Sequence, residues 1–583
     1  MNRATMLERR NALEDRYAPW TARTTAQLFD RWATSDPDRP FVLGQDAEFS
    51  YGQMREYSLR LAAGLAAVGV RPGDRVAVDM ANFADLIALK LATARVGAVS
   101  VAINFLLRRD ELAYVLEQSE ASVLITMDQF RELDYLQCLD SIVPGWEHGG
   151  GTDRLPLLRH VFVRPVETPT PARGAPLSCL AEAGAGLPDA VVDALTQRID
   201  PASVSDILYT SGTTGQSKGV MLVHDSIVRM AYGSAYARVF QDGRRIAYAL
   251  PMYHVFGYIE GMMAAVIVGG AVVPSITFEP EAMLEAVARH RVDELLAVPA
   301  MTARLLDAAQ TGRYDLTHLS TVFSSGGAHA PQMWPRMVEV FGVDELFTAY
   351  GQTETTASTV CTLAGDPVTR LQTTNGTIKP AGAAGDPALG GGLAAYKVIS
   401  PDTGEELPAG EIGEFIARGP AISPGYFNKP AETAQAITAD GWLRTGDLGR
   451  IDADGYLVLT GRIKESYRFG GELVLPSEVE GVLCRHPTVA AAYVVGVPHE
   501  RMGEVGCAFV VAAEGAVIAE AELLAHCADL LARFKVPAHV LVIDESQVPV
   551  TVTGRVQKFL LAEQAIEVLG KAPATQAETM EMT

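Results

Sequence analysis

The chain has 583 residues, and its 70 acidic and 48 basic side chains give a formal net charge of −22. This length exceeds what one hydrophobic core supports, so we expect a large, subdivided domain and a smaller one. The acidic balance excludes nucleic acid and an anionic membrane as principal partners, although it allows a local basic site for phosphates. Residues 1–17 alternate Arg with Glu and predict an exposed arm, and the uncharged, largely apolar run at 261–277 is too short for a membrane span. We therefore expect a cytoplasmic protein.

The first part of the chain alternates helical and strand-like segments. Apolar residues recur at helical spacing along 51–68, and short apolar runs bounded by Gly, Pro or Asp indicate buried strands. This alternation predicts a mostly parallel sheet covered by helices on both faces. Residues 144–200, rich in Pro, Ala and Gly, are expected to form an irregular surface excursion. The predicted helices are 25–33, 51–68, 83–96 and 109–119, and the predicted strands are 75–78, 98–103 and 122–126.

A second block repeats the pattern and is followed by two segments of different character. The predicted strands 245–250, 271–274, 294–298 and 322–325 alternate with helices 257–268 and 280–290, which suggests two related α/β subdomains with a cleft between them. Turn signals at 401–404, 440–441 and 454–455 then indicate a β-rich segment. Beyond residue 462 we expect a small α+β domain with helices 478–485 and 520–531, strands 489–497, 506–512 and 540–543, and a frayed tail from 571.

Residues 208–219, Leu-Tyr-Thr-Ser-Gly-Thr-Thr-Gly-Gln-Ser-Lys-Gly, combine hydroxyls, glycines and a lysine between two apolar runs. Glycines let the backbone approach a phosphate closely, hydroxyls donate to its oxygens, and a lysine adds a point charge. The loop is not a Walker loop, because its glycines are too closely spaced and Gly219 follows the lysine. An ordinary polar surface loop is the alternative. The predicted phosphate-binding residues are Thr210, Ser211, Gly212, Thr213, Thr214, Gly215 and Lys218.

The string Thr-Ser-Gly-Thr-Thr-Gly-x-x-Lys-Gly resembles the phosphate-binding signature of the adenylate-forming superfamily, which comprises acyl-CoA synthetases, adenylation domains of nonribosomal peptide synthesis and luciferases. The resemblance implies an α/β fold with a large N-terminal domain, built from two α/β subdomains and a β-rich one, and a small mobile α+β C-terminal domain. It implies an AMP-binding domain at 1–463, a mobile domain at 464–583 and a hinge at Lys464 between them.

Residues 252–257, Met-Tyr-His-Val-Phe-Gly, resemble the family segment at the acyl pocket, where His254 would be a gate or wall. A histidine before an apolar helix is otherwise a structural residue. The resemblance assigns the acyl channel to Tyr253, His254, Gly257, Gly326 and Gly351. The absent side chains at three of these positions predict room for a ring or chain.

Two further strings resemble the nucleotide site. Ser-Gly-Gly-Ala at 325–328 and Tyr-Gly-Gln-Thr-Glu at 350–354 would frame adenine, with Tyr350 against the base, Thr353 on the α-phosphate and Glu354 as the Mg²⁺ ligand. An aromatic face stacks on a purine, and a hard divalent cation prefers a carboxylate oxygen, so these residue types suit the chemistry. A plain turn is the alternative. The nucleotide-binding residues of these two strings are Gly326, Gly327, Ala328, Tyr350, Gly351 and Gln352.

Residues 442–447 and 461–462 resemble the ribose clamp of the family. Asp447 would accept both ribose hydroxyls while the fork of Arg462 reaches a hydroxyl or phosphate, and Leu459 is assigned to the same nucleotide site. The alternative for Asp447 is a hairpin-turn aspartate. Beyond the hinge, Gly470 and Gly471 belong to a glycine-rich turn that resembles the contact with CoA.

The chain departs from the family pattern at two places. Arg555 holds the position of the lysine that serves adenylation, and Leu473 replaces a polar residue. Because arginine keeps the charge but is bulkier than an ammonium, we expect adenylation to survive and to be slowed or retuned to an unusual acid. The assigned catalytic residues are Lys218, Thr353, Glu354 and Arg555.

The resemblance implies an ATP- and Mg²⁺-dependent acid–CoA ligase like the fatty-acid and 4-coumarate enzymes, acting on a small-molecule carboxylic acid. Two rivals remain open. The first is an adenylating enzyme of specialised metabolism that uses an unusual, even inorganic, acid or a non-CoA acceptor such as an amine or carrier protein. The second is a non-catalytic nucleotide- or acyl-binding relic. The sequence leaves the acid, the acceptor and the choice between monomer and homodimer undecided.

Overall fold

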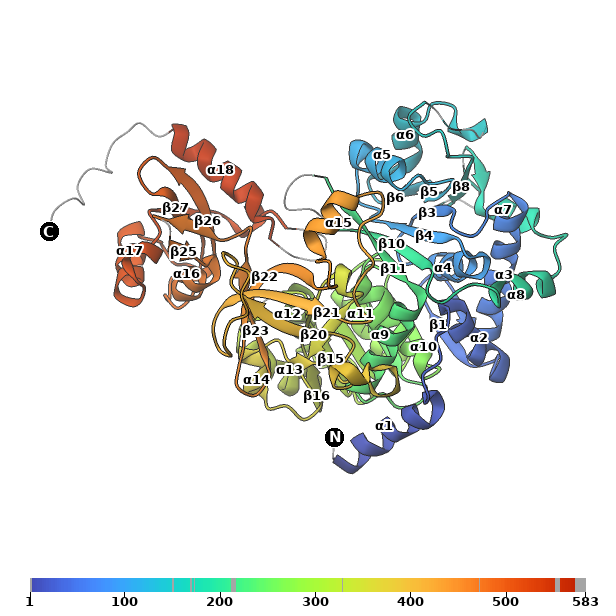
Figure 1. The fold of residues 1–583 in the computed structure, drawn as a ribbon, viewed down its shortest axis with the longest axis horizontal. Helices are drawn as coiled ribbons and strands as arrows, with labels where there is room; N and C mark the ends of the chain where they lie inside the picture. Colours follow the sequence, from blue (N-terminus) through green and yellow to red (C-terminus); the bar gives the residue numbers. More distant parts are fainter. Residues whose placement is uncertain are drawn as a thin grey trace. The chain divides into compact units, whose positions relative to one another are not determined.

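The computed structural model describes residues 3–148, 151, 153–167, 170–171, 173–210, 216–327, 329–470, 472–550 and 556–571 (Figure 1). The predicted frayed tail therefore lies almost wholly outside the described residues. The chain divides into two compact units, one formed by Met1–Tyr396 with Ala417–Arg444 and the other by Lys397–Ile416 with Thr445–Thr583. The predicted boundary at Lys464 remains a prediction about where the chain bends.

Within the described part of the large unit, one seven-stranded sheet carries the predicted phosphate loop. All its pairings are parallel except the one between the strands Val204–Thr210 and Lys218–Val223. These two strands are joined by a short connection, which forces an antiparallel hairpin. The predicted strands are confirmed to within a residue or two. In spatial order the strands are β11 (Lys218–Val223), β10 (Val204–Thr210), β4 (Val99–Ile103), β3 (Arg75–Asp79), β5 (Val123–Met127), β8 (His160–Arg164) and β9 (Ala175–Pro176).

Helices cover both faces of this sheet, as the near-continuous apolar strands require. On one face α3 (Tyr51–Ala67) and α4 (Ala84–Val96) share a core with Val76 and Val78, and on the other α5 (Arg109–Gln118) and α6 (Tyr135–Ile142) share a core with Ala77 and Val101. Ser50 and Gln53 form a capping box that starts α3, and Gly97, at φ 70°, ends α4. Alternate residues of one strand therefore serve two different cores.

The prediction of an irregular excursion at 144–200 is wrong in part. The segment contains β8 and β9, which extend the sheet, and the helices α7 (Leu177–Ala183) and α8 (Asp189–Thr196). The N-terminal arm is also not fully exposed, because Arg3–Tyr17 forms α1, which buries Leu13 and Tyr17. In both places a few apolar residues bury against distant parts of the chain, which local composition does not reveal.

A second seven-stranded sheet in the described large unit is mostly parallel, and its last two strands come from the N-terminal region. The two α/β blocks are therefore not strictly serial in the chain. In spatial order the strands are β16 (Glu345–Phe347), β15 (Thr321–Ser324), β14 (Glu294–Ala297), β12 (Arg245–Tyr248), β13 (Ala271–Pro274), β1 (Pro40–Leu43) and β2 (Glu48–Ser50). Its neighbouring helices include α2 (Thr25–Ser35), α9 (His224–Ala237), α11 (Pro280–Arg289), α12 (Pro299–Ala309) and α13 (Met333–Phe341).

The helix predicted at 257–268 has a different form. Phe256–Met263 is a π-helix, η2, and only Ala264–Ile267 continues as the α-helix α10. A π-helix hydrogen-bonds five residues apart and is found mainly at functional sites. A short three-stranded sheet follows, formed by β17 (Ala349–Gly351), β18 (Ser358–Cys361) and β19 (Thr377–Ile378).

The smaller unit contains most of two antiparallel-rich sheets. The first is β20 (Ala395–Ile399), β21 (Gly413–Arg418), β22 (Leu443–Ile451) and β23 (Leu457–Arg462), in line with the predicted β-rich segment. The second is β25 (Glu472–Val474), β24 (Tyr467–Phe469), β27 (Gly503–Ala512), β26 (Val489–His499) and β28 (His539–Val542). It packs α16 (Pro476–Leu483) and α17 (Glu520–Leu530) on one face and α18 (Lys558–Lys571) on the other.

Within the described ranges, every helix is too short or too polar to cross a bilayer.

Candidate active site

The predicted phosphate loop lies at the end of a buried hairpin. Thr210 of β10 pairs with Lys218 of β11, and the ladder continues inward through apolar residues such as Leu208 and Val220. The intervening residues Ser211, Gly212, Thr213, Thr214 and Gly215 lie outside the described residues. The hairpin holds the two ends of the loop at a fixed separation, which a phosphate cradle requires.

Lys218 and Glu354, which the sequence assigns to separate motifs, meet at one tyrosine. The Tyr426 hydroxyl donates a 2.9 Å hydrogen bond to Glu354 Oε1, and Lys218 Nζ lies 4.6 Å from the centre of the same ring. Burial raises the pKa of the Tyr426 phenol and the negative charge of Glu354 raises it further, so the hydroxyl stays a donor. The three side chains form a cation–ring–carboxylate arrangement, which we call the Tyr426 bridge.

The segment 423–427 carries Tyr426 along the edge of β11. Met221 N–H donates to Gly425 O at 3.0 Å, Phe427 N–H donates to Gly219 O at 2.8 Å, and the Ser423 hydroxyl donates to Met221 O at 2.7 Å. The same segment reaches the other motif, because Ser423 N–H donates to Glu354 O at 2.8 Å. Sequence reasoning missed Tyr426, since Ser-Pro-Gly-Tyr-Phe is ordinary turn composition and its partners are remote in the chain.

The predicted adenine and metal string forms a tight turn between β17 and β18. Thr355 accepts from Gln352 N–H at 2.9 Å and donates to Ala357 O at 2.8 Å. Thr356 has φ 64°, a left-handed conformation that costs a β-branched residue about 1–3 kcal/mol. Thr353 is buried at the start of this turn. Strain of this kind persists only where surrounding contacts hold it, and it is concentrated at functional sites.

Two of the three predicted pocket glycines serve close packing and do not create room. A Cβ on Gly351 would lie 2.1 Å from Ala357 O, and a Cβ on Gly257 would lie 2.6 Å from Leu250 O. The prediction that absent side chains leave space for an acid is therefore wrong at these two positions. Gly326 differs, because its φ of 91° favours glycine and, among the described residues, its Cβ would meet only Val298, at 3.3 Å. Assignment of these glycines to an acyl channel stays a prediction.

The segment that carries Tyr253 and His254 is fixed by Asn82, another residue that sequence reasoning missed. The buried Asn82 amide donates to Leu250 O at 2.9 Å and accepts from Met252 N–H at 2.9 Å. Burial lowers the pKa of His254 to about 4, and Phe256 N–H donates to its Nδ1 at 3.2 Å. The ring is therefore neutral near pH 7 with its proton on Nε2. The Tyr253 hydroxyl is buried and has no partner among the described residues.

The end of β15 is tied to the nucleotide string. The Ser325 hydroxyl donates to Ala349 O at 2.8 Å, directly before Tyr350. Gly326 and Gly327 follow Ser325 in an irregular segment, whereas Ala328 lies outside the described residues. Tyr350 is 7% exposed. The two strings predicted to frame adenine are thus joined by a hydrogen bond.

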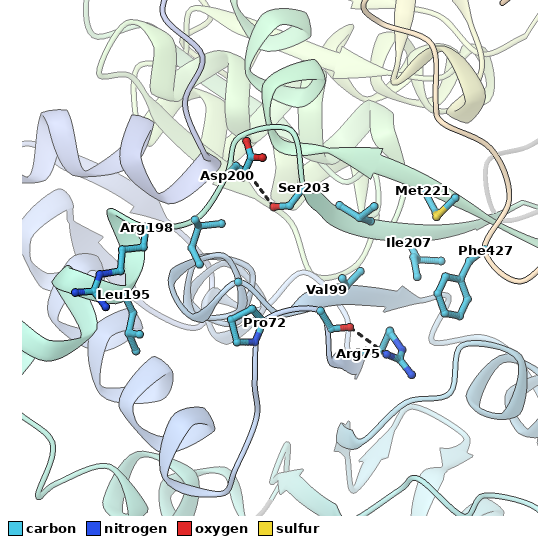
Figure 2. Close-up of a pocket in the computed structure, with 14 residues that line it drawn as sticks. Pro72, Arg75, Val99, Leu195, Arg198, Asp200, Ser203, Ile207, Met221 and Phe427 are labelled. Carbon is cyan, nitrogen blue, oxygen red and sulfur yellow. Dashed lines mark hydrogen bonds between the residues drawn. The ribbon is translucent and has the colours of Figure 1, made fainter.

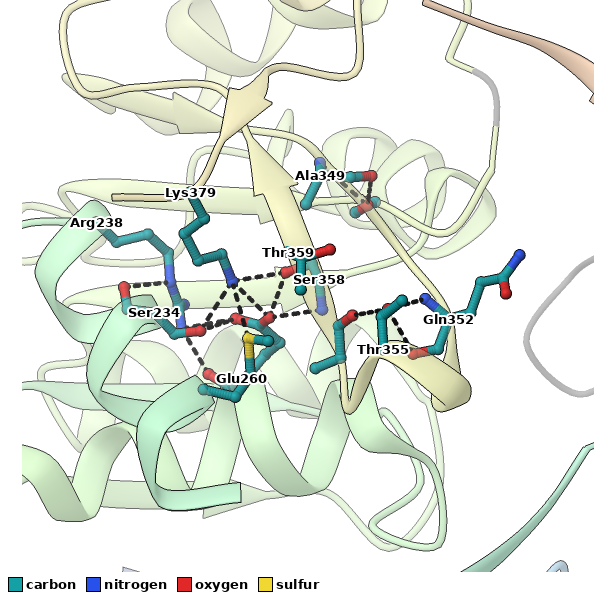
Figure 3. A network of polar contacts seen from close by, with 12 residues as sticks. Ser234, Arg238, Glu260, Ala349, Gln352, Thr355, Ser358, Thr359 and Lys379 are labelled. Atoms are coloured by element: carbon teal, nitrogen blue, oxygen red, sulfur yellow. Dashed lines mark hydrogen bonds and ion pairs between the residues drawn. The ribbon is translucent and has the colours of Figure 1, made fainter. Parts of the chain in front are cut away.

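A buried charge cluster lies beside the turn (Figure 3). Lys379 Nζ lies 2.8 Å from Glu260 Oε1 and donates at 2.8 Å to Ser358 Oγ and at 2.9 Å to Ser234 Oγ. Burial by itself raises the pKa of Glu260, but the charges of Lys379 and Arg238 lower it to about 2. The carboxylate is therefore ionised at neutral pH. We call Ser234, Glu260, Ser358 and Lys379 the Glu260 cluster.

The smaller unit holds the predicted ribose clamp. Asp447 and Arg462 are register partners on β22 and β23, and Arg462 Nε lies 2.8 Å from the buried Asp447 Oδ1. Leu459 is 38% exposed on β23, and Lys464 follows in a turn closed by Glu465 and Ser466 N–H groups on Arg462 O. Gly470 has φ 56° and donates to Met502 O at 2.9 Å. Gly471 and Arg555 lie outside the described residues.

A pocket of about 570 Å³ opens elsewhere in the large unit, at the amino ends of β3, β4 and β10 (Figure 2). Its walls are mainly apolar and include Val99, Ile207, Met221 and Phe427. Because none of its lining residues belongs to the predicted site, the pocket is separate from the Tyr426 bridge. In parallel sheets ligands bind at the carboxyl ends of the strands, and this is the opposite end.

Within the described ranges, no group of three or more His, Cys, Asp or Glu side chains is arranged to hold a metal. The Tyr426 bridge instead offers one carboxylate and one ammonium beside a hydroxyl-rich hairpin. Such a set suits a polyphosphate with a divalent cation, because Mg²⁺ is commonly bound through one or two carboxylates together with substrate phosphates.

Comparison with known proteins matches nearly the whole chain. The family model described as AMP-binding enzyme covers residues 29–427, and the model of the AMP-binding enzyme C-terminal domain covers residues 478–555. A methyl-dioxo-octahydroindenyl-propanoyl:CoA ligase of Mycobacterium tuberculosis is 35% identical over 545 residues, which are 93% of this chain and 99% of the relative. A mitochondrial medium-chain acyl-CoA ligase of Danio rerio is 30% identical over 561 residues, 95% of this chain and 90% of the relative.

Solved structures agree in fold. The ATP-bound crystal structure of MatB from Rhodopseudomonas palustris has a TM-score of 0.79 and 28% identity, and the match covers 93% of this chain and 99% of that one. O-succinylbenzoate CoA synthetase from Bacillus subtilis, in complex with its acyl-adenylate, has a TM-score of 0.72 and 26% identity over 92% of this chain and 97% of its own. The predicted α/β fold with a large N-terminal and a small C-terminal domain is confirmed.

Proposed function

The chain belongs to the AMP-binding enzyme family and is an AMP-forming acid–CoA ligase, and we propose that its Tyr426 bridge handles the triphosphate of ATP. The observation that carries this proposal is the contact of one tyrosine with both Lys218 and Glu354. Two motifs remote in sequence thereby present opposite charges at one place, as binding of a metal-complexed phosphate requires.

The enzyme activates a carboxylic acid with ATP and then transfers the acyl group to CoA. In the first step an oxygen of the acid carboxylate attacks the α-phosphorus, and the bond to the bridging oxygen breaks so that pyrophosphate leaves with the electron pair. The Lys218 ammonium offsets charge on the phosphates, and the Thr353 hydroxyl donates to an α-phosphate oxygen. Positioning and charge neutralisation supply most of the catalysis, so no enzyme nucleophile is needed.

Glu354 fits a magnesium ion. Its Oε1 accepts from Tyr426, while Oε2 has no hydrogen-bond or ion-pair partner within the described ranges. A carboxylate held at one oxygen leaves the other for a hard cation, with phosphate oxygens and water completing the shell. When bound, Mg²⁺ would offset the negative charge of the phosphates. Tyr426 orients the carboxylate toward that role.

We propose an apolar carboxylic acid as the substrate. The relatives named above act on medium-chain acids and on a bicyclic propanoate, which share an apolar body. In this chain, the partnerless Tyr253 hydroxyl and the Nε2–H of His254 are donors available to the carboxylate end of such an acid. A buried hydroxyl without a protein partner is accounted for when a ligand supplies the acceptor.

The proposal also assigns roles to residues of the smaller unit. Asp447 would accept the ribose hydroxyls, Arg462 would hold Asp447 and reach the nucleotide, and Leu459 would flank it. Lys464 would be the hinge of the movement between half-reactions, and Gly470 and Gly471 would meet CoA. A cytoplasmic location and a monomer or homodimer remain predictions.

The rival readings are not favoured, because the relatives are named CoA ligases and match over most of their length. The experiment is pyrophosphate release by the full chain with octanoate, decanoate, benzoate, 4-coumarate and acetate, each with and without CoA. We expect slow release with an apolar acid alone and sustained turnover when CoA is added. Release that CoA leaves unchanged, or use of acetate alone, would contradict the proposed acceptor or acid class.

A further inference from the structure

The Glu260 cluster joins two segments that the proposed function assigns to different substrates. Glu260 lies on η2, which begins two residues after His254, and Ser358 begins β18, directly after the turn that carries Glu354. We propose that Ser358 is a positioning residue that couples the acid-binding segment to the nucleotide-binding turn through Glu260 and Lys379. The proposal rests on the function proposed above.

Ser358 is held to Glu260 at two atoms. Its N–H donates to Glu260 Oε1 at 3.2 Å, and its hydroxyl also donates to that oxygen. Lys379 donates to the same hydroxyl at 2.8 Å, so the serine is fixed from both sides of an ion pair (Figure 3). Hydrogen bonds to charged groups are short and strong, and in a buried setting they are not replaced by water.

The turn transmits the position of Ser358 to the nucleotide residues. Ser358 pairs with Gly351 across β17 and β18, at the point where the register shifts. A Cβ on Gly351 would lie 2.5 Å from Ser358 Cα, so the two backbones are in close contact. A shift of Ser358 therefore moves Gly351 and its neighbour Tyr350.

The acid-binding segment is tied to the same carboxylate from the other side. Glu260 is 1% exposed in the π-helix, and Arg238 donates to Glu260 O at 2.7 Å. Phe256, the first residue of that helix, packs edge-on against Phe323 with ring centres 5.1 Å apart. Because a buried helix moves as a unit, the position of Glu260 follows that of the His254 segment.

A second serine of the Glu260 cluster, Ser234, offers a control substitution for Ser358. Ser234 of α9 donates to Glu260 Oε2 at 2.6 Å and accepts from Lys379 at 2.9 Å. Ser234 thus makes the same pair of contacts as the Ser358 hydroxyl, but α9 carries no predicted site residue. Ser234→Ala and Ser358→Ala remove the same chemical group from the same ion pair, but only the second loosens the turn, where the Ser358 N–H bond to Glu260 is then left alone.

The test compares these two variants and Ser358→Thr, which keeps a hydroxyl, as full-length proteins. The measurements are the Kd of ATP with Mg²⁺, the KM of the acid that the wild type uses fastest in the panel above, and the thermal midpoint. We expect Ser358→Ala to raise the Kd of ATP and the KM of the acid by about tenfold each, Ser234→Ala to change both by less than about twofold, and Ser358→Thr to recover most of the loss. The thermal midpoint should fall similarly in both alanine variants.

Equal changes of Kd and KM in the two alanine variants would show that the cluster is only structural and would overturn the proposal. An unchanged Kd of ATP in Ser358→Ala would also overturn it. If the wild type released no pyrophosphate with any acid, the proposed function would fail separately, and the Kd of ATP would still decide whether Ser358 positions the nucleotide-binding turn.

Discussion

Removing the hydroxyl of Tyr426 isolates the contact that defines the candidate site. Tyr426→Phe keeps the ring against Lys218 but removes the 2.9 Å hydrogen bond to Glu354. A hydrogen bond to a charged group contributes about 1.5–3 kcal/mol, so kcat/KM for ATP should fall by about 10- to 100-fold. The reason is that the unheld carboxylate has several orientations and spends less time in the one that suits the metal.

The assay is acid-dependent exchange of pyrophosphate into ATP, measured over a range of Mg²⁺ concentrations. Loss of orientation should raise the Mg²⁺ concentration needed for half-maximal exchange, whereas a general loss of stability would not. Tyr17→Phe is the matched control, because Tyr17 is buried and donates a 2.7 Å hydrogen bond to Ile267 O, and neither residue belongs to the predicted site. It should lower the thermal midpoint without changing the Mg²⁺ dependence.

Two outcomes would refute this reasoning. Exchange by Tyr426→Phe that equals the wild type at every Mg²⁺ concentration would show that the tyrosine does not orient Glu354. An equal change in Mg²⁺ dependence in Tyr17→Phe would show that the effect reports stability and not the site.

Three further predictions follow from single residues. Burial lowers the pKa of His224 to about 4, so between about pH 6.5 and 4 the unfolded chain binds a proton that the folded one does not. The free energy of unfolding should therefore fall by about 1.4 kcal/mol per pH unit as the pH drops through this range. Urea titrations at several pH values should show that the free energy of unfolding of His224→Gln falls less steeply with decreasing pH than that of the wild type. Gly351→Ala should reduce the use of large and small acids alike and cost about 1–3 kcal/mol of stability, since its Cβ would meet Ala357 O. If the acid panel instead showed loss of activity with large acids alone, the prediction that Gly351 lines the acyl channel would be supported. Arg555→Lys should speed adenylate formation from an ordinary acid without changing thioester formation from supplied adenylate, and separate assays of the half-reactions would disprove this if no ordinary acid gained.

Local patterns were sufficient for much of the fold. The strand predicted at 75–78 is observed as Arg75–Asp79, and the helix predicted at 109–119 as Arg109–Gln118. Both are short apolar or amphipathic runs with clear stops, so their structure depends mainly on neighbouring residues. The predictions failed where burial depends on distant partners, as for α1, whose Tyr17 hydroxyl bonds Ile267 O.

The candidate site shows the same division. Lys218 and Glu354 could be predicted as site residues from the sequence because their motifs are contiguous. Their meeting at Tyr426, and the pairing of Glu260 with Lys379, depend on contacts between remote segments that no local spacing reveals. Gly351 was recognised as part of a motif, but its physical role was misread, because only the folded backbone shows how closely Ala357 approaches it.

The most direct test of the account is the first half-reaction in Lys218→Ala and Glu354→Gln, measured as acid-dependent pyrophosphate exchange with the acid that the wild type prefers. Each change removes one charged group from the triphosphate site, so exchange should fall by about 100-fold or more, on the scale of about 3 kcal/mol for a preorganised electrostatic group. Thioester formation from supplied acyl-adenylate should stay close to the wild-type rate. Exchange that is unchanged in both variants would contradict the assignment of the Tyr426 bridge to ATP.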